Sequence, residues 1–452
     1  YLCFMIPATI YSSLTAKLNK NQIIHLLMFT FSICSLIHSR SRAAWLGVFV
    51  SLLLLLLLHS NYIFLQFKKH YQRKYPYIVS ALILGIIFIF IYTEPIVDNA
   101  PEYKKSIWST LISTDKNDFK NTLGERIPLY SSTVNMTKDH IILGVGYNNW
   151  RVQHPAYYGN YIHDENYLKL NQRPHNDLLW IISEGGIVGL LLFMSVVILP
   201  LIFTLKQIIY KSNNTNLLIN SVLFVSIISI LVESLFDFPK QRTIPNLYMW
   251  TFLGYLSIQL PSKKNLSNYH LKLTRLILLS ISVSVSIFAY RDYKSNQFSK
   301  QMLVMKSQKE YDLGIINGKN ALSYGKNVDN TGTPITFYLG VLEYQKGNTI
   351  NSEKYFSKAL DIHPYHLGTL ENYMIIKAKS NQFEKALEIM THLRSMYPKY
   401  YSPVIKMIKL YLQQNKIDEA NLLIEVTNFN DATQSIKKMV DNLKNYIILQ
   451  SR

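Results

Sequence analysis

Long apolar segments alternate with short polar connections over the first two thirds of the chain. A helix needs about 20 apolar residues to cross the hydrocarbon core of a bilayer. On that criterion the candidate spans lie near residues 1–16, 22–38, 43–66, 77–92, 178–205, 217–236, 246–260 and 273–290. The third contains an uninterrupted run of leucines from Leu52 to Leu58. The pattern predicts an all-α, polytopic transmembrane helix bundle.

Positive charges in the connections predict which helix ends face the cytoplasm. One set of connections is rich in cations: Lys17, Lys20, Lys68, Lys69, Arg73, Lys74, Lys206, Lys211, Lys263, Lys264, Lys272 and Arg275. The opposite set carries only Arg40, Arg42, Lys240 and Arg242. Because cytoplasmic loops carry the excess of Lys and Arg, we expect the first set to be cytoplasmic. Residues 93–177 then form one long loop on the outer side, and the C-terminal region lies outside too.

Beyond residue 290 the apolar runs stop and a 34-residue period appears. The period relates Gly347, Asn381 and Asn415, then Ser352, Ala386 and Ala420, and then Pro364 and Pro398. Each unit reads as a helix, a polar turn and a second helix with a small residue where the two approach, which resembles the tetratricopeptide repeat. Such a domain could offer a docking groove for a partner or glycan, or it could act as a stabilising scaffold. The sequence leaves both open.

Composition agrees with a membrane protein. The 452 residues carry 47 Lys and Arg against 28 Asp and Glu, a formal charge of +19, yet 49% are hydrophobic and the mean hydropathy is +0.07. We attribute the positive charge to cytoplasmic loops rather than to nucleic-acid binding. Cys3 and Cys34 both lie in apolar runs, so no disulfide framework is indicated. Residue 1 is a Tyr inside an apolar run, and we expect further membrane helices before it.

The predicted domains are therefore 1–92, N-terminal transmembrane helices; 93–177, a long outer loop; 178–292, C-terminal transmembrane helices; and 293–452, a soluble helical-repeat domain. Aromatic and apolar residues are frequent in the loop, which argues against disorder. We expect the chemistry to lie there, because long loops in compact proteins are commonly functional.

The first candidate cluster in the loop combines Arg126 with a glycine-containing turn. Gly124-Glu125-Arg126 precedes Gly144-Val145-Gly146-Tyr147-Asn148-Asn149-Trp150. Gly144 and Gly146 permit a tight turn and a close approach of backbone to a ligand. Arg126 offers a cationic fork suited to phosphate oxygens. A simple turn with a solvated arginine is the competing interpretation.

The second cluster, Arg173-Pro174-His175-Asn176-Asp177, stands directly ahead of the run that starts at residue 178. An imidazole at the membrane boundary can take a proton from a hydroxyl. A capping or packing role for His175 is the alternative, and His140, His154 and His163 are rivals in the same loop. No metal-binding spacing of His and Cys occurs, so no metal or cofactor is predicted.

The third cluster is Ser183-Glu184-Gly185-Gly186 with Gly189, inside the next apolar run. A carboxylate is costly in hydrocarbon unless it is paired or lies near the interface. The glycines fit close helix packing as well as they fit a functional site.

Taken in order, these motifs resemble the O-antigen ligase and polymerase superfamily, whose relatives include the bacterial protein O-oligosaccharyltransferases. Members with an appended tetratricopeptide domain occur. The resemblance covers about residues 35–260, and two further segments support it: Ser41-Arg42-Ala43-Ala44, and Ser234-Leu235-Phe236-Asp237-Phe238-Pro239.

The resemblance implies a metal-independent membrane glycosyltransferase in the bacterial inner (cytoplasmic) membrane, with the long loop and the repeats in the periplasm. Its donor would be an undecaprenyl diphosphate-linked glycan, and its acceptor lipid A-core, another lipid-linked glycan, or a protein hydroxyl. His175 would be the general base. Arg126 would bind the diphosphate, with Arg40 and Arg42 as second choices. The remaining candidates for substrate binding are Gly144, Gly146, Asn149, Asn176, Asp177 and Glu184; Asp177 or Glu184 could orient His175.

Two other classes compete with the transferase. A transporter is less favoured because the spans show no paired, broken helices in corresponding halves. A non-enzymatic scaffold for surface-polysaccharide assembly would use the repeats to recruit a protein partner and leave the loop inert.

Overall fold

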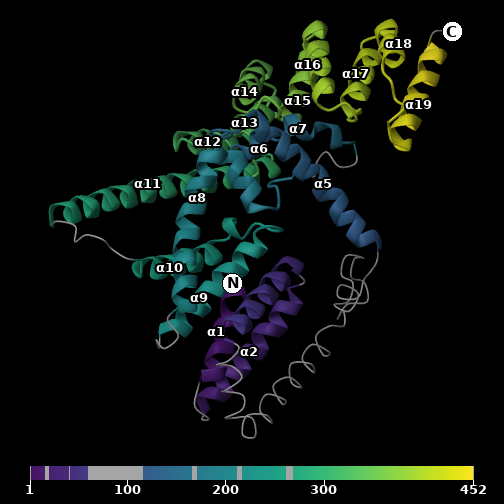
Figure 1. Cartoon of the computed structure of the whole chain (residues 1–452). Coiled ribbons are helices and arrows are strands. Elements are labelled where there is room, and N and C mark those ends of the chain that lie inside the picture. The colour runs from purple at the N-terminus through teal and green to yellow at the C-terminus, as the bar shows by residue number, and fades with distance from the viewer. Residues whose placement is uncertain are drawn as a thin grey trace. The chain divides into compact units, whose positions relative to one another are not determined.

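The computed structural model describes residues 2–15, 20–39, 41–59, 116–164, 171–210, 216–260 and 268–450 (Figure 1). Within these ranges the regular structure is helical apart from one isolated bridge between Val328 and Pro334. The chain divides into two compact units. Unit 1 comprises Tyr1–Tyr130, His140–Gly144 and Arg173–Lys263, and unit 2 comprises Ser131–Asp139, Val145–Gln172 and Lys264–Arg452. The long loop thus contributes residues to both.

The helices of unit 1 follow the predicted apolar runs. They are α1 (Leu2–Thr15), α2 (Lys20–His38), the helix Arg42–His59, α8 (Asp177–Tyr210), α9 (Asn216–Glu233), the short η2 (Pro239–Gln241) and α10 (Thr243–Ile258). The predicted run 77–92 lies outside the described residues. Among the described residues, three helices are long and apolar enough to cross a membrane: Arg42–His59, Asp177–Tyr210 and Leu271–Ser307. The protein is therefore an integral membrane protein.

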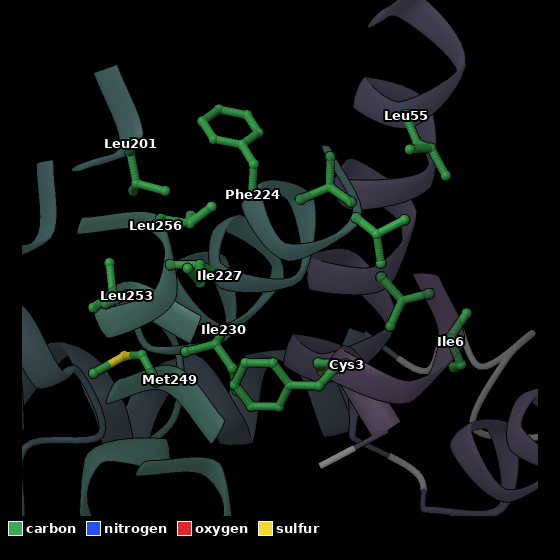
Figure 2. Packing of buried hydrophobic residues seen from close by; sticks show 14 of the residues in the cluster. Cys3, Ile6, Leu55, Leu201, Phe224, Ile227, Ile230, Met249, Leu253 and Leu256 are labelled. Atoms are coloured by element: carbon green, nitrogen blue, oxygen red, sulfur yellow. The ribbon is translucent and has the colours of Figure 1, made fainter. Parts of the chain in front are cut away.

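The core of unit 1 forms around α9. Val225 and Ile227 are fully buried, and residues of α1, α8 and α10 pack against the same helix. Figure 2 shows Ile227 and Ile230 among Met249, Leu253 and Leu256 of α10. Small residues allow close approach: the Gly47 Cα lies so near the Ser229 carbonyl that a Cβ there would come within 2.4 Å of the oxygen. Packing of this kind, rather than exclusion of water, holds helices together in lipid.

Helix α11 (Asn268–Ser307) has two parts of different character. Its residues from Leu271 to Tyr290 are exposed and mostly apolar, as lipid contact requires. The same helix continues without a break across residue 292, where the sequence predicts the domain boundary. Ser295, Ser299 and Met302 are buried further along, beside α12 (Tyr311–Ser323). A 40-residue helix therefore supplies both a candidate span and the first helix of the C-terminal part of unit 2.

The remaining helices form consecutive pairs, which lie in a row in Figure 1. The pairs are α13 (Ile335–Gln345) with α14 (Thr349–Ile362), α15 (Leu367–Lys379) with α16 (Phe383–Met396), and α17 (Ser402–Gln413) with α18 (Ile417–Val426), followed by α19 (Gln434–Gln450). Gly347, Asn381 and Asn415 all have positive φ in the turn inside each pair. The small residues Ser352, Ala386 and Ala420 are fully buried. These features are consistent with the predicted 34-residue repeat.

Part of the long loop is built into the repeat unit. This part comprises the end of α5 (Lys116–Asp139) after Tyr130, together with α6 (Trp150–Gln153), α7 (Pro155–Tyr158) and η1 (Gly159–Tyr161). The Asp164 carboxylate accepts hydrogen bonds from the backbone N–H groups of Tyr401 (3.0 Å) and Ser402 (2.7 Å) and so caps α17. Arg151 donates to the backbone carbonyl of Asn330. This half of the loop is thus an ordered element of unit 2.

Candidate functional site

The entry to α8 carries the second sequence cluster. His175 has a positive φ of 54°, which is uncommon for a residue other than glycine. Asn176 caps the helix, because its Oδ1 accepts a hydrogen bond from Leu179 N at 2.9 Å. Asp177 begins the helix, where the macrodipole favours an acidic side chain. The chain therefore turns sharply at His175 and presents its half-buried imidazole at the start of α8.

A second segment, the turn from Ser234 to Arg242, packs against this entry. The Asp177 backbone N–H donates to the Ser234 carbonyl at 2.8 Å. The Phe238 ring lies edge-on to the His175 ring, with centroids 5.0 Å apart and planes at 72°. The guanidinium carbons of Arg173 and Arg242 lie 4.0 and 5.3 Å from the centroid of the same ring. Phe238 thus contacts one imidazole and two cations, and cation–π attraction holds the guanidinium groups there.

Helix α5 brings a third cation to His175. Arg126 and Tyr130 are one helical turn apart, and their side chains interact electrostatically. The Tyr130 hydroxyl donates to the His175 backbone carbonyl at 3.0 Å. Burial raises the pKa of Tyr130, although the Arg126 guanidinium lowers it in part. The phenol therefore stays protonated and remains a donor to the strained His175 backbone.

Lys240 forms the other side of the site. Its backbone N–H donates to Asp177 Oδ2 at 2.8 Å, and its ammonium lies 4.3 Å from the Trp180 ring centroid. Burial lowers the pKa of Lys240, and the carboxylates of Glu184 and Asp177 raise it in part. Both carboxylates are buried on α8. Lys240 is thus a partly buried cation influenced by two acidic groups. The Arg242 guanidinium pairs with Asp237 at 3.3 Å.

The other predicted residues have varied positions. Arg42 is exposed at the start of its helix, and Arg40 lies outside the described residues. Gly144 belongs to unit 1 and packs against the α8 backbone at Glu184. Gly146 and Asn149 belong to unit 2, where Asn149 Nδ2 donates to the Val145 carbonyl at 3.0 Å. Unit 1 therefore brings together Arg126, Gly144 and the cluster from His175 to Glu184.

The rival histidines also have distinct environments. His154 is buried in unit 2, its Nε2 2.7 Å from Ser132 Oγ and its ring stacked on Trp150 at 4.0 Å. Burial lowers its pKa to about 3. His140 is exposed. His154 is consequently a neutral core residue, whereas His175 lies beside cations.

Sequence reasoning did not single out Tyr130, Phe238, Lys240 or Arg242 as site residues, and it named Arg173 in the second cluster without assigning it a role. Two signals could have found them. Lys240 and Arg242 are among the few cations predicted on the side opposite the lysine-rich connections, and Phe238 lies in a segment that carries the family resemblance. Within the described residues, no group of three or more His, Cys, Asp and Glu side chains is placed to hold a metal ion.

The arrangement suits the chemistry of an anionic ligand. A planar guanidinium group can donate two parallel hydrogen bonds to phosphoryl oxygens. A half-buried imidazole beside such groups can accept a proton. No curated protein matches the chain. A family model described as O-antigen ligase matches residues 27–194, a range that includes Arg126, His175 and Glu184. Residues 27–194 therefore form an O-antigen ligase family domain of this integral membrane protein.

Proposed function

We propose that this protein transfers a glycan from undecaprenyl diphosphate to an acceptor hydroxyl at the periplasmic face of the cytoplasmic membrane. The family match supports a ligase- or polymerase-type glycosyltransferase. The observation that supports transfer from a lipid diphosphate is that three segments meet at one site. Arg126 comes from α5, His175 from the entry to α8, and Arg242 from the turn before α10, which lies outside the matched range.

In this mechanism the guanidinium groups bind the diphosphate. Arg126, Arg173 and Arg242 stabilise the negative charge that grows on the leaving oxygen. The acceptor oxygen attacks the anomeric carbon while the bond from that carbon to the diphosphate oxygen breaks. His175 accepts the hydroxyl proton. Direct displacement of this kind inverts the anomeric configuration.

The other polar groups position these side chains. Tyr130 fixes the His175 backbone through its hydrogen bond to the carbonyl. Asp177 fixes the turn at Lys240 through the backbone N–H of that residue. Lys240 adds a positive charge close to Glu184 and Asp177. Because these groups are held before the substrate arrives, little reorganisation accompanies the reaction.

The test is complementation in hosts that lack the ligase or the protein glycosyltransferase, with lipopolysaccharide and total protein both profiled for glycan. His175→Ala and Arg126→Ala are compared with His140→Ala and Lys138→Ala, which change exposed residues of the same loop. We expect the first two to lose about 100-fold or more of the product while still reaching the membrane, and the controls to retain it.

The acceptor follows from which product the wild-type chain restores: glycosylated lipid A-core, lengthened glycan, or glycosylated protein. Full product from both His175→Ala and Arg126→Ala would contradict the proposed chemistry. In that case the scaffold hypothesis predicts that deletion of residues 308–452 abolishes function instead.

A further inference from the structure

The turn that follows α5 exposes three apolar side chains in succession. Ile141, Ile142 and Leu143 are 48%, 64% and 72% exposed. Loop tips in water normally carry polar or small residues, and a contiguous apolar patch marks an interaction surface. The turn also hides its polar backbone, since Gly144 N donates to the His140 carbonyl at 2.8 Å. Its side chains therefore need an apolar environment that the described residues do not supply.

The turn is hydrogen-bonded to α8 at a break in that helix. Gly186 has φ 64° and ψ −168°, so the helix is interrupted there and a new helical segment begins at Ile187. The first N–H groups of any helix lack partners inside it. Here Ile187 N donates to the Ile141 carbonyl at 2.8 Å, and Val188 N contacts the Ile142 carbonyl at 3.4 Å.

Two glycines make this contact possible. Gly144 has φ 67°, and a Cβ on it would lie 2.4 Å from the backbone carbon and oxygen of Glu184. A Cβ on Gly186 would lie 2.1 Å from the Ile142 carbonyl oxygen. Neither position admits a side chain, so the turn and α8 meet backbone to backbone. The carbonyl groups of Ile141 and Ile142 are thereby satisfied, which is the condition for placing irregular backbone at membrane depth.

The position of the break along α8 fixes the depth of the turn. From Ile187 to Tyr210 the helix has roughly 24 residues and is about 36 Å long, enough to cross the ~30 Å hydrocarbon core without the preceding segment. The break therefore lies at the end of the span nearest Asp177 and Glu184. The exposed Ile187, Val188 and Leu191 begin the lipid-facing surface of α8, and the turn continues that surface.

We propose that Ile141, Ile142 and Leu143 insert among the acyl chains of the membrane leaflet next to the site. The occupant is bilayer lipid rather than a protein partner, because the patch is continuous with the lipid-facing side of α8. The insertion sets Glu184 and the entry to α8 at the level of the lipid head groups. This inference requires only that α8 spans the membrane and does not depend on glycan transfer.

Site-directed fluorescence in lipid nanodiscs tests the insertion. Cys3 and Cys34 are replaced by Ser, and single cysteines are introduced as Ile142→Cys and Leu143→Cys and labelled with an environment-sensitive dye. Leu191→Cys, exposed on α8, is the lipid reference, and Lys138→Cys, exposed on α5, is the water reference. Each labelled chain must elute as the unlabelled one does in size-exclusion chromatography.

We expect dyes at 142 and 143 to behave as the dye at 191 does, with blue-shifted emission. Quenching by nitroxide-labelled lipid should be at least threefold stronger than quenching by iodide. Quenching by iodide to the level seen at 138 would overturn the inference, because the turn would then lie in water. Protection from both quenchers would overturn it as well, because protein would then cover the patch. The two positions must agree, which guards against a local distortion by either substitution.

Discussion

The long loop supplies histidines to both units, and His154 of unit 2 and His175 of unit 1 lie in opposite environments. His154 is buried in unit 2 between Trp150 and Tyr158, with ring centroids at 4.0 and 5.1 Å. His175 is half-buried in unit 1, has a strained backbone, and lies beside Phe238 and its two arginines. Both residues are histidines in contact with aromatic rings. The difference teaches that a histidine becomes a candidate for chemistry through the charges around it and its access to solvent.

The largest expected difference between the two units is their response to low pH, which should destabilise unit 2. Burial lowers the pKa of His154 and His363 to about 3 and that of His366 to about 4, whereas an unfolded histidine titrates near 6.5. Between these values the unfolded state binds more protons. These histidines therefore do not lower the free energy of unfolding of unit 2 above about pH 6.5. As the pH drops towards 4, they lower it by several kcal/mol.

Peptide-resolved hydrogen exchange of the full chain, corrected for the intrinsic pH dependence, measures this loss in α13 to α17. The variant His366→Asn keeps an N-cap acceptor for Thr369 N but removes one titrating group. It should make the pH dependence shallower. An unchanged opening free energy from pH 7 to pH 4.5 in the wild-type chain would contradict the buried, neutral state of these histidines.

Removal of the His154 ring should destabilise unit 2 without affecting the chemistry of unit 1 directly. His154→Ala leaves a cavity between Trp150 and Tyr158 and removes a hydrogen-bond partner of Ser132. We expect a loss of about 3 kcal/mol, read as faster exchange in peptides that cover residues 150–161. His140→Ala is the matched control because that side chain is exposed. Equal exchange in both variants would mean that His154 does not support the core.

A substitution of Phe238 tests unit 1 alone. Its expected effect is smaller and falls on glycan transfer rather than on stability. Phe238→Leu keeps an apolar side chain but removes the aromatic face beside Arg173 and Arg242. We expect glycan transfer to fall about tenfold at limiting donor, since two cation–π contacts of about 0.7 kcal/mol each add up to about 1.4 kcal/mol. Phe236→Leu, at an exposed position of the same turn, is the control. Equal rates for the two variants in a membrane-based transfer assay would show that the aromatic face does not position the arginines.

The smallest expected effect concerns the cap that the loop provides to a repeat helix. Asp164→Ala removes the acceptor for the N–H groups of Tyr401 and Ser402. The first turn of α17 should lose about 1 kcal/mol of protection against exchange. Asp164→Asn retains one amide oxygen and should recover part of that loss. Protection that is the same in wild type and Asp164→Ala would mean that solvent caps the helix equally well.

Local patterns of the sequence predict the helices well because each pattern acts within a segment. The apolar runs at 43–66, 178–205 and 273–290 coincide with the three helices suited to span a membrane. The 34-residue period places Gly347, Asn381 and Asn415 in turns that require a positive φ. Glycine and asparagine adopt that conformation most readily. The break in α8 at Gly186 was not predicted, because the glycines of the Ser183–Gly186 cluster fit close helix packing as well as they fit a functional site.

The sequence by itself determined the membrane helices, the helical pairs of the C-terminal third, and the residues that resemble the O-antigen ligase family. Apolar length and turn preference act over a few residues, so one chain segment suffices to specify them. Only the tertiary structure decided that Phe238 and Lys240 meet the entry to α8, that Gly144 packs on α8, and that His154 is a core residue. Those outcomes depend on contacts between distant segments, whose geometry and burial no single stretch of sequence encodes.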